Sequence, residues 1–306
     1  MTLCLTTVSA LKTDAARDIA RRSPGAIGPM KQLGGRRWSA TEVSIDRTAQ
    51  AELEEFLAVE AAAGETDWAL TSTGPRRKRL LISDMDSTII GQECLDELAD
   101  FAGLKAEVSA ITEKAMRGEL DFEAALTTRV AMLRGLPLSA LDDCHASRIT
   151  LNPGARILVA TMRANGARCV LVSGGFGFFT SKVSASAGFD ADRANTLIHD
   201  GDTLTGEVGR PILGREAKLT ALLEETALRG LSASDAIAIG DGANDLAMIR
   251  AAGLGVAFKA KPVVAAETRA RIEFTDLSAA LFFQGYAEDE FVDPDISPLS
   301  RLDRHE

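Results

Sequence analysis

The sequence predicts an α/β protein, in which a doubly wound parallel sheet carries a helical cap insertion and follows a small α+β domain. Three observations lead to this prediction. From residue 80 onward, short apolar runs alternate with longer helical patterns. Residues 91–150 are almost wholly helical in pattern, and residues 1–73 have their own cycle of strands and helices. We therefore expect domains at 1–73 and 80–286, with the cap 91–150 inserted, and a poorly ordered acidic tail at 287–306.

The first domain is expected to alternate two strands with two helices. LCLTTVS (3–9) and RRWSATEVSI (36–45) have the composition of strands. TDAARDIARRS (13–23) and TAQAELEEFLAVEAAAG (48–64) have the apolar spacing of amphipathic helices. The polar stretch STGPRRKR (72–79) is the expected linker to the second domain.

The second domain is expected to contain the parallel sheet. Its expected strands are 80–84, 169–173, a segment near 195–199, 236–241 and 254–258. Residues 91–150 lie between the first two strands and are too long for a single crossover helix, so we expect them to form a cap. Further along, Asp200-Gly201 is flanked by Thr and Leu residues and predicts a short hairpin.

Composition and charge limit the possible functions. The net charge is −10, from 34 basic and 44 acidic residues, which argues against a general nucleic-acid binder. No apolar run has the length needed to span a membrane, and the start of the chain lacks the basic n-region of a signal peptide. The 4 cysteines are scattered without a CxxC pair, as in a reduced protein. We therefore expect a soluble, cytoplasmic protein.

Two aspartates follow the first strand of the second domain. Asp84 and Asp86 alternate at the C-terminal end of the apolar run Leu80-Leu81-Ile82, and ligands of open α/β sheets bind outside that end of the strands. Two crowded carboxylates repel each other and need a cation, usually Mg²⁺, to coexist. One of them is then free to act as a nucleophile, as in aspartyl-phosphate chemistry. An acidic turn or helix cap is the alternative that these residues alone leave open.

Polar residues also follow two later strands. Ser173 and Gly174 end the run CVLVS, where a hydroxyl and glycine amides can approach a phosphate closely, although a Gly-rich turn is the alternative. Asp241 ends the run AIAIG and is placed to complete a site for a hard cation. Asn244 and Asp245 then open a helix, which they would otherwise simply cap. The dense cluster D-G-x-N-D favours a functional role.

One lysine completes the set of candidate residues. Lys218 lies in the helical pattern GREAKLTALL, where a lone lysine is ordinarily a solvated surface residue. A site that carries a dianionic phosphoryl group and several aspartates, however, favours one nearby cation.

The four motifs DMDST, SGGF, the lysine of REAKL, and GDGAND resemble, in order, those of the haloacid dehalogenase-like phosphatases. The resemblance covers residues 80–283 and implies the Rossmannoid core of that family. Two segments of the expected cap, GQECLDELA and AMRGELDFEAALTTRVAMLRGLP, are similar to the substrate-recognition parts of the phosphoserine phosphatases in that family.

This resemblance implies a role for each motif residue. Asp84 is the expected nucleophile, and Asp86 the acid that protonates the leaving oxygen and then the base that activates water. The implied Mg²⁺ ligands are Asp84, the main-chain carbonyl of Asp86, and Asp241. The remaining contacts to the phosphoryl group, metal and lysine are expected from Ser173, Gly174, Lys218, Asn244 and, as a supporting residue, Asp245.

The cap residues would set the specificity. Glu93 and Arg129 lie in helical patterns, where a charged side chain is ordinarily on the surface. The resemblance makes them the partners of the substrate's ammonium and carboxylate groups, a pair that recognises a zwitterionic amino acid. A lid over a phosphatase site excludes water and supplies specificity. Met116 and Phe122, which would otherwise be packing residues, are implied as lid contacts.

The implied function is Mg²⁺-dependent hydrolysis of O-phospho-L-serine to L-serine and phosphate, the last step of serine synthesis by the phosphorylated route. Two alternatives stay open. A related phosphatase or phosphotransferase would use another acceptor such as homoserine, and a regulatory amino-acid-binding protein would lack catalysis. The N-terminal segment resembles small ACT-like α+β domains, and its apolar faces allow a homodimer. Besides a small-molecule substrate, we expect no nucleic-acid or membrane partner.

Overall fold

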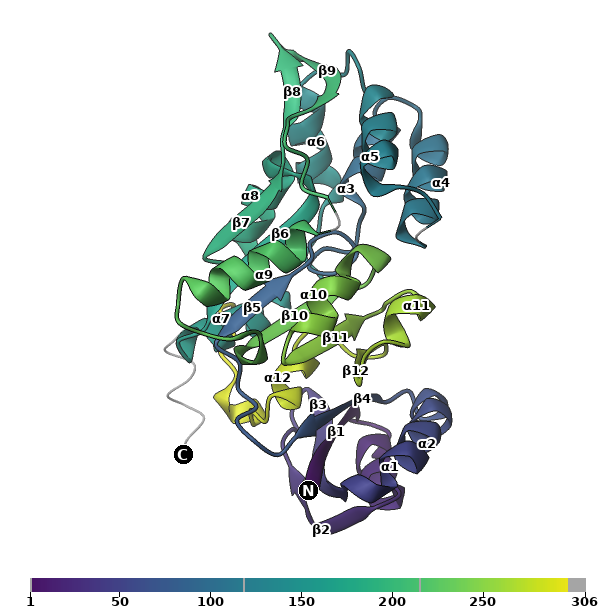
Figure 1. Ribbon diagram of the computed structural model, residues 1–306, viewed down its shortest axis with the longest axis vertical. Helices are drawn as coiled ribbons and strands as arrows, with labels where there is room; N and C mark the ends of the chain where they lie inside the picture. The colour runs from purple at the N-terminus through teal and green to yellow at the C-terminus, as the bar shows by residue number, and fades with distance from the viewer. Residues whose placement is uncertain (1, 118, 215, 297–306) are drawn as a thin grey trace. The chain divides into compact units, whose positions relative to one another are not determined.

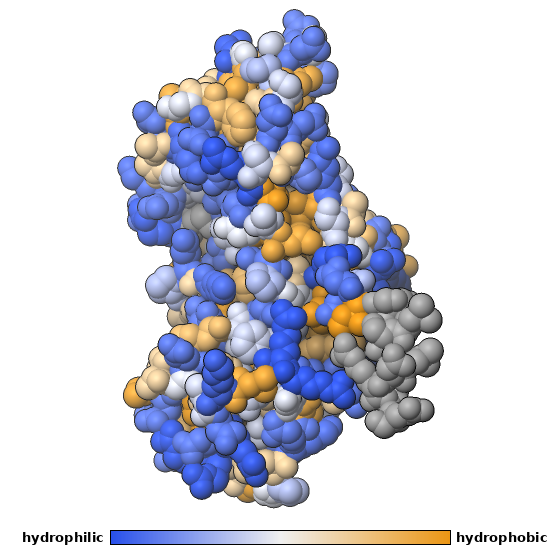
Figure 2. Space-filling view, turned by 180° about the vertical axis from the view of Figure 1, so that it is seen from behind, coloured by the Kyte–Doolittle hydropathy of each residue, from blue (hydrophilic) through white to orange (hydrophobic). Residues whose placement is uncertain are grey.

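The computed structural model of the protein describes residues 2–117, 119–214 and 216–296, apart from the side chain of Met116. In these residues, no helix has the length and apolar character needed to cross a lipid bilayer. On the face shown in Figure 2, hydrophilic side chains cover most of the described surface, and hydrophobic side chains form smaller patches between them.

By their internal contacts, the residues divide into two compact units. The first comprises Met1–Arg79, Pro153–Arg168 and Ile272–Glu306. The second comprises Leu80–Asn152 and Cys169–Arg271. The expected domains at 1–73 and 80–286 stay a prediction, and each unit is described separately below.

Four antiparallel strands form the sheet of the first unit, in the order β2-β3-β1-β4 (Figure 1). Leu53 and Leu57 of one helix and Ile19 of the other join a buried cluster with Leu5 and Val43 of the sheet. Along the chain the elements follow a β-α-β-β-α-β order, and the ACT-like assignment itself stays a prediction. The elements are β1 (Thr2–Ala10), α1 (Ala15–Arg22), β2 (Ala26–Gln32), β3 (Trp38–Asp46), η1 (Arg47–Ala49), α2 (Gln50–Ala63) and β4 (Asp67–Ser72).

The sequence patterns predict β1 and β3 but not β2 and β4. In β2 the register shifts between Ile27 and Lys31, and Gly28 has a positive φ of 74°, so the alternation of apolar and polar residues that marks a strand is lost. The sequence DWALTS of β4 begins with Asp67, a residue type that is depleted in strands. The carboxylate of Asp67 accepts backbone hydrogen bonds from Glu273, Phe274 and Thr275, which satisfies this buried charge.

The segment expected to be a poorly ordered tail is described as far as residue 296. There the carboxylate of Glu288 accepts the backbone N–H groups of Gly35, Arg36 and Arg37 at 2.8, 2.6 and 2.5 Å, so this part is held by specific contacts within the first unit. Residues 297–306 lie outside the described residues. The other elements of this unit are α7 (Ala155–Ala164), α12 (Ala279–Phe283) and η4 (Glu288–Glu290).

The second unit contains a largely parallel sheet, as predicted, with strand order β12-β11-β10-β5-β6-β7. The strand expected near 195–199 is wrong in position, because β7 ends at Asn195 and Leu197–Asp200 belongs to a separate hairpin, and β12 was not predicted. Parallel pairing is found between β5 and β10, β10 and β11, and β6 and β7. The chain leaves β5 toward β6 and β7 on one side and later returns to β10 and β11 on the other, so the direction of winding reverses between β5 and β10. These strands are β5 (Leu80–Ser83), β6 (Arg168–Phe176), β7 (Ala191–Asn195), β10 (Ala236–Gly240), β11 (Leu254–Phe258) and β12 (Ala270–Ile272).

Alternate residues of the central strands form the core on one face of this sheet. Leu80 and Ile82 of β5 and Ala238 of β10 pack with Leu222 of one helix and Met248 of another. These helices cover that face, which agrees with the predicted α/β class. The helices of this part are α8 (Gly177–Ala187), α9 (Ala217–Ala227), α10 (Leu246–Ala251) and α11 (Pro262–Ala265), with the short turns η2 (Ala233–Asp235) and η3 (Ala243–Asp245).

Residues 91–150 are helical, as predicted. They form α3 (Cys94–Asp100), α4 (Lys105–Met116), α5 (Phe122–Ala131) and α6 (Ser139–Arg148). The predicted hairpin, β8 (Leu197–Asp200) and β9 (Thr203–Val208), is also present and lies beside these helices (Figure 1). Leu204 exchanges backbone hydrogen bonds with Gly135 and Leu136, so the hairpin forms part of the cap.

Candidate active site

The first two aspartates of the site lie where the winding of the sheet reverses. Asp84 follows β5 and Asp241 follows β10, and these two strands pair in parallel from Leu80↔Ala236 onward. The backbone N–H of Asp84 continues this ladder by donating to the carbonyl of Ile239 at 3.0 Å. Both side chains are buried, with 5% and 2% exposure. A reversal between parallel strands leaves a crevice at their carboxyl ends, which is where ligands bind in such sheets.

Lys218 joins these acids from the first turn of α9. Its Nζ lies 2.8 Å from Oδ2 of Asp84 and 2.6 Å from Oδ1 of Asp245. Burial by itself lowers the pKa of Lys218, but the charges of Asp245 and Asp84 outweigh it and raise that pKa above its usual value. The lysine, which the sequence alone would place on the surface, is therefore a buried cation that pairs with two carboxylates.

Asp245 is completely buried and supports the turn after β10. Its Oδ2 accepts the backbone N–H groups of Asp241 at 3.1 Å and Gly242 at 3.0 Å. A Cβ added at Gly240 would overlap the carboxyl group of Asp245, so only glycine leaves the room for this arrangement. Asp245 thus acts as a brace between the lysine and the strand end.

Carboxylate oxygens of Asp84, Asp241 and Asp245 all lie within 4.8 Å of one another. Burial and then the charge of Asp245 raise the pKa of Asp84 well above its usual range, and the same two causes raise that of Asp241 to about 7. Lys218 offsets only part of this negative charge. A cluster of buried oxygen ligands with excess negative charge fits a hard divalent cation.

Asp86 is not part of this cluster, and its two carboxylate oxygens have other partners. Its Oδ1 accepts the backbone N–H of Cys94 at 2.8 Å, and its Oδ2 accepts the hydroxyl of Ser173 at 3.2 Å. Burial raises the pKa of Asp86 above its usual value, against these hydrogen bonds. A carboxyl group with a raised pKa is suited to give and take a proton.

Ser173 and Gly174 lie near the end of β6, which extends to Phe176 rather than ending at Ser173 as predicted. The Ser173 hydroxyl oxygen accepts the backbone N–H of Gly175 at 2.8 Å. A Cβ at Gly174 would lie 2.6 Å from Cζ of Phe122, so the glycine allows this cap residue to approach the strand. The side-chain amide of Asn195 donates to the carbonyl of Gly174 at 2.9 Å and fixes the loop from behind.

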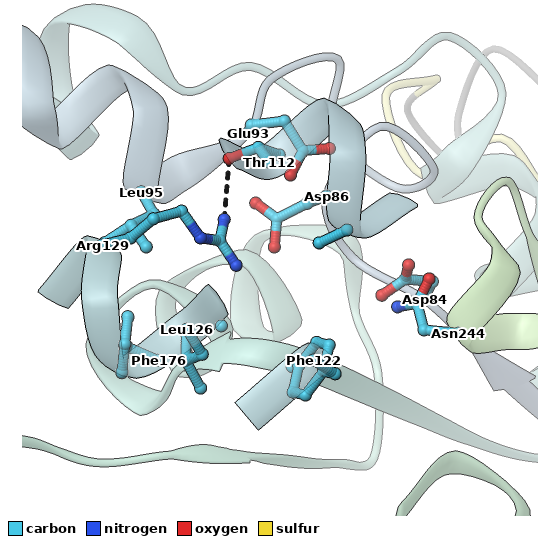
Figure 3. Close-up of a pocket in the computed structure, with 13 residues that line it drawn as sticks. Asp84, Asp86, Glu93, Leu95, Thr112, Phe122, Leu126, Arg129, Phe176 and Asn244 are labelled. Carbon is cyan, nitrogen blue, oxygen red and sulfur yellow. Dashed lines mark hydrogen bonds between the residues drawn. The ribbon is translucent and has the colours of Figure 1, made fainter. Parts of the chain in front are cut away.

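One cavity in the second unit collects most of the predicted residues. It has a volume of about 70 Å³, well above the roughly 10–15 Å³ that one water needs. Figure 3 shows Asp86 and Glu93 with their carboxylates on one side, Arg129 beside them, and Phe122, Leu126 and Phe176 on the opposite side. The predicted residues that line the cavity are Asp84, Asp86, Glu93, Phe122, Arg129, Gly174 and Asn244.

Glu93 and Arg129 therefore enter the same cavity from different cap segments. Glu93 precedes α3, and its Oε1 accepts the hydroxyl of Ser87 at 2.6 Å. Burial and then the charge of Asp86 raise the pKa of Glu93 well above its usual range. Arg129 lies in the last turn of α5 and is 7% exposed. Its burial lowers the pKa of the guanidinium, so an anionic partner would stabilise the charge.

Some residues around the site were not predicted as site residues, although two of them, Ser87 and Thr88, belong to the motif DMDST. Thr88 donates to Oδ1 of Asp241 at 3.3 Å, and Ser87 has a positive φ of 54° in the turn that presents Asp86. Both are adjacent to the predicted aspartates, so the motif itself could have indicated them. Asn195 and Thr112 are far from any motif in sequence, and no local pattern marks them. The side chain of Met116 lies outside the described residues.

Comparison with known proteins agrees with this geometry. A family model described as haloacid dehalogenase-like hydrolase matches residues 81–250. A protein named phosphoserine phosphatase from Polaromonas sp. is 48% identical over 191 residues, which cover 61% of this chain and 81% of that protein. Another of that name, from Streptomyces coelicolor, is 43% identical over 257 residues, 82% of this chain. The chain spans only 62% of the length of the Streptomyces protein.

A solved structure supports the same relationship. It is described as a phospho-aspartyl intermediate analogue of phosphoserine phosphatase and superposes with a TM-score of 0.65 at 37% identity. The superposition covers 68% of this chain and 99% of the other.

Proposed function

Because this chain belongs to the haloacid dehalogenase-like hydrolase family, we propose that it hydrolyses O-phospho-L-serine to L-serine and phosphate. One observation carries the proposal. The buried carboxylate of Asp84, paired with Lys218, opens onto the same cavity as the oppositely charged pair Glu93 and Arg129. The proposed nucleophile, Asp84, and the two residues proposed to bind a zwitterionic amino acid, Glu93 and Arg129, thus line the same small cavity.

Asp84 is the proposed nucleophile. One of its carboxylate oxygens attacks phosphorus, the bond from phosphorus to the serine oxygen breaks, and the phosphoryl group is carried on Asp84. Lys218, which lies 2.8 Å from Asp84, stabilises the ionised carboxylate before attack and the phosphoryl oxygens afterwards. Ser173 and the amides of the glycine loop are proposed to bind the remaining phosphoryl oxygens, with Asn244 at the cavity wall.

Asp86 is the proposed acid and base. Its raised pKa favours the protonated form, which gives its proton to the departing serine oxygen. The resulting carboxylate then takes a proton from the water that attacks the phosphorylated Asp84. This second step releases phosphate, restores the Asp84 carboxylate and returns the proton to Asp86, so that the cycle balances.

Mg²⁺ is the proposed cation at the acidic cluster. Asp84, the main-chain carbonyl of Asp86, and Asp241 would hold it, while Asp245 braces Asp241 and Lys218. When bound, the cation supplies positive charge that offsets the carboxylates and the phosphoryl oxygens.

Glu93 and Arg129 are proposed to select the amino acid. Glu93 would hydrogen-bond the substrate ammonium and Arg129 would bind its carboxylate, while Phe122 lines the cavity beside Gly174. Met116 is kept in the proposal as a lid contact from the resemblance alone. A phosphate monoester whose alcohol carries no ammonium or carboxylate group would leave Glu93 and Arg129 without ligand partners, which costs binding energy.

The cellular setting follows from the same proposal. All 4 cysteines of the chain are buried and the sequence has no CxxC pair, which supports the reducing cytoplasm that we propose. There the enzyme would complete serine synthesis by the phosphorylated route. A homodimer formed through the first unit also stays a prediction.

Phosphate release from several substrates tests the function. We expect O-phospho-L-serine to have a higher kcat/KM than p-nitrophenyl phosphate, with Mg²⁺ required in both cases. A preference for the substrate that is not an amino acid would contradict the roles of Glu93 and Arg129. Formation of phosphohomoserine when homoserine is added would instead support the phosphotransferase alternative. Serine binding without any turnover would support the regulatory one.

A further inference from the structure

Arg129 is connected to a second acidic residue through a threonine. Its Nη1 donates to Oγ1 of Thr112 on α4 at 2.8 Å (Figure 3). The hydroxyl of Thr112 in turn donates to Oδ1 of Asp96 on α3 at 2.6 Å. All three side chains are buried, with 7%, 3% and 8% exposure. The chain of hydrogen bonds therefore joins three cap helices behind the cavity.

The hydroxyl of Thr112 has a single proton, so it can donate only one hydrogen bond at a time, and its principal acceptor determines how the three side chains are connected. Thr112 also lies 3.2 Å from the carbonyl of Val108 one turn earlier, the usual partner of a threonine in a helix. The 2.6 Å contact to a carboxylate is shorter and charge-assisted, so Asp96 is the principal acceptor. The lone pairs of the oxygen are then directed to the guanidinium of Arg129.

This arrangement leaves part of Arg129 available to a ligand. Among the described residues, its hydrogen bonds use Nη1 and Nε, the latter to the carbonyl of Ala125 at 3.3 Å, and none uses Nη2. In Figure 3 the guanidinium end is directed toward the cavity. Because a hydroxyl separates Arg129 from Asp96, the acid orients the guanidinium without forming a bidentate ion pair with it.

We propose that Thr112 and Asp96 are positioning residues that hold Arg129 in the orientation needed to bind the carboxylate of the substrate. This inference rests on the proposed function, in which the substrate is an amino-acid phosphate. A preoriented guanidinium loses little conformational freedom when the substrate binds. The relay of Asp96, Thr112 and Arg129 therefore contributes to substrate selectivity rather than to phosphoryl transfer.

Kinetics on two substrates test the relay. O-Phospho-L-serine is compared with phosphoethanolamine, which has the same phosphate and ammonium groups but no carboxylate. We expect Thr112→Val to lower kcat/KM for phosphoserine about 10- to 100-fold, mainly through KM, and to change phosphoethanolamine less than about twofold. Thr112→Ser, which keeps the hydroxyl, should restore most of the loss. In an Arg129→Ala background, Thr112→Val should have no further effect.

Thr128→Val is the matched control. Thr128 is exposed on α5, next to Arg129, and its hydroxyl donates only to the carbonyl of Ala124 at 2.8 Å among the described residues. This variant should leave both substrates unchanged. Asp96→Asn keeps the shape of the acceptor and removes its charge. If Thr112→Val fails to fold, this variant tests whether the relay orients Arg129. It should show a smaller loss than Thr112→Val, confined to phosphoserine, because the amide oxygen still accepts the hydroxyl of Thr112 but without charge assistance.

The two ways to fail are separate. If the unaltered protein does not prefer phosphoserine to phosphoethanolamine, the proposed function is wrong, and the relay has no carboxylate to recognise. If the preference is present and survives in folded Thr112→Val and Asp96→Asn, the relay alone is wrong. Equal losses on both substrates, or the same effect from Thr128→Val, would also overturn it.

Discussion

The two sides of the cavity hold their charged groups in different ways. At the carboxyl ends of the sheet strands, Asp84 follows β5 and Asp241 follows β10, and the pairing of these two strands sets the separation of the two residues. On the cap side, Glu93 and Arg129 come from separate segments, and hydrogen bonds of their side chains, such as that of Arg129 to Thr112, fix their direction. In the proposed function, the chemistry would therefore rest on groups that the backbone of the sheet holds, while selectivity would rest on groups that single residues of the cap could change.

Removing the proposed nucleophile should abolish the chemistry at the carboxyl ends of the strands and have the largest effect. We expect Asp84→Asn to lower kcat for phosphoserine by at least about 10⁴-fold, because no other carboxylate replaces the attacking oxygen. Phosphate release at saturating substrate measures this loss. Circular dichroism should show an unchanged fold, and robust turnover by this variant would contradict the mechanism.

Removing the cap cation should give a smaller and more selective loss. We expect Arg129→Ala to lower kcat/KM for phosphoserine about 100-fold, since a charge-assisted contact to the carboxylate is lost. A phosphate monoester whose alcohol carries no charged group, such as p-nitrophenyl phosphate, should be affected far less. Comparable losses on both substrates would mean that Arg129 serves the fold or the chemistry instead of selectivity.

Gly174 near the end of β6 contacts Phe122 of the cap, and this contact should be sensitive to added side-chain volume at Gly174. A methyl group added by Gly174→Ala would lie 2.6 Å from Cζ of Phe122, so the cap residue would have to move. We expect about a tenfold rise in KM for phosphoserine. Combining it with Phe122→Ala removes the clash. The double variant should therefore have a lower KM than expected from adding the two single effects, and purely additive effects would argue against this contact.

The acidic cluster should also make the stability of the fold depend on pH. We expect this to be the smallest of the predicted effects. Burial and Asp245 raise the pKa of Asp241 to about 7. A carboxyl group whose pKa is higher in the folded chain stabilises the fold fully below its unfolded pKa, and this contribution is lost as pH rises through the folded value. We expect the Tm of protein treated with EDTA to fall by about 2–4 °C between pH 5 and pH 8.

Two controls distinguish this effect from general pH dependence. Added Mg²⁺ should restore the Tm at pH 8, because the cation stabilises the ionised carboxylates. Asp241→Asn should have a flatter pH profile in EDTA. A Tm that does not change with pH in the unaltered protein would contradict the raised pKa of this group.

Local patterns were sufficient for much of the second unit. The strands β5, β10 and β11 are short apolar runs, and such runs predict buried parallel strands directly. The helical character of 91–150 and the hairpin after residue 196 were also predicted. By contrast, β2 and β4 were missed, because the bulged register of one and the buried acid of the other interrupt the strand pattern.

By itself, the sequence predicted the residues of the proposed chemistry: DMDST, SGGF, REAKL and GDGAND contain the acids, the loop and the lysine, and their resemblance to one family implied the role of each. Only the tertiary structure decided that Lys218 is buried between Asp84 and Asp245 and that Glu93 and Arg129 face one cavity. It also decided the relay through Asp96 and Thr112, which lie 33 and 17 residues before Arg129. The apolar spacing of a helix marks its buried face but does not identify which distant helix packs against it.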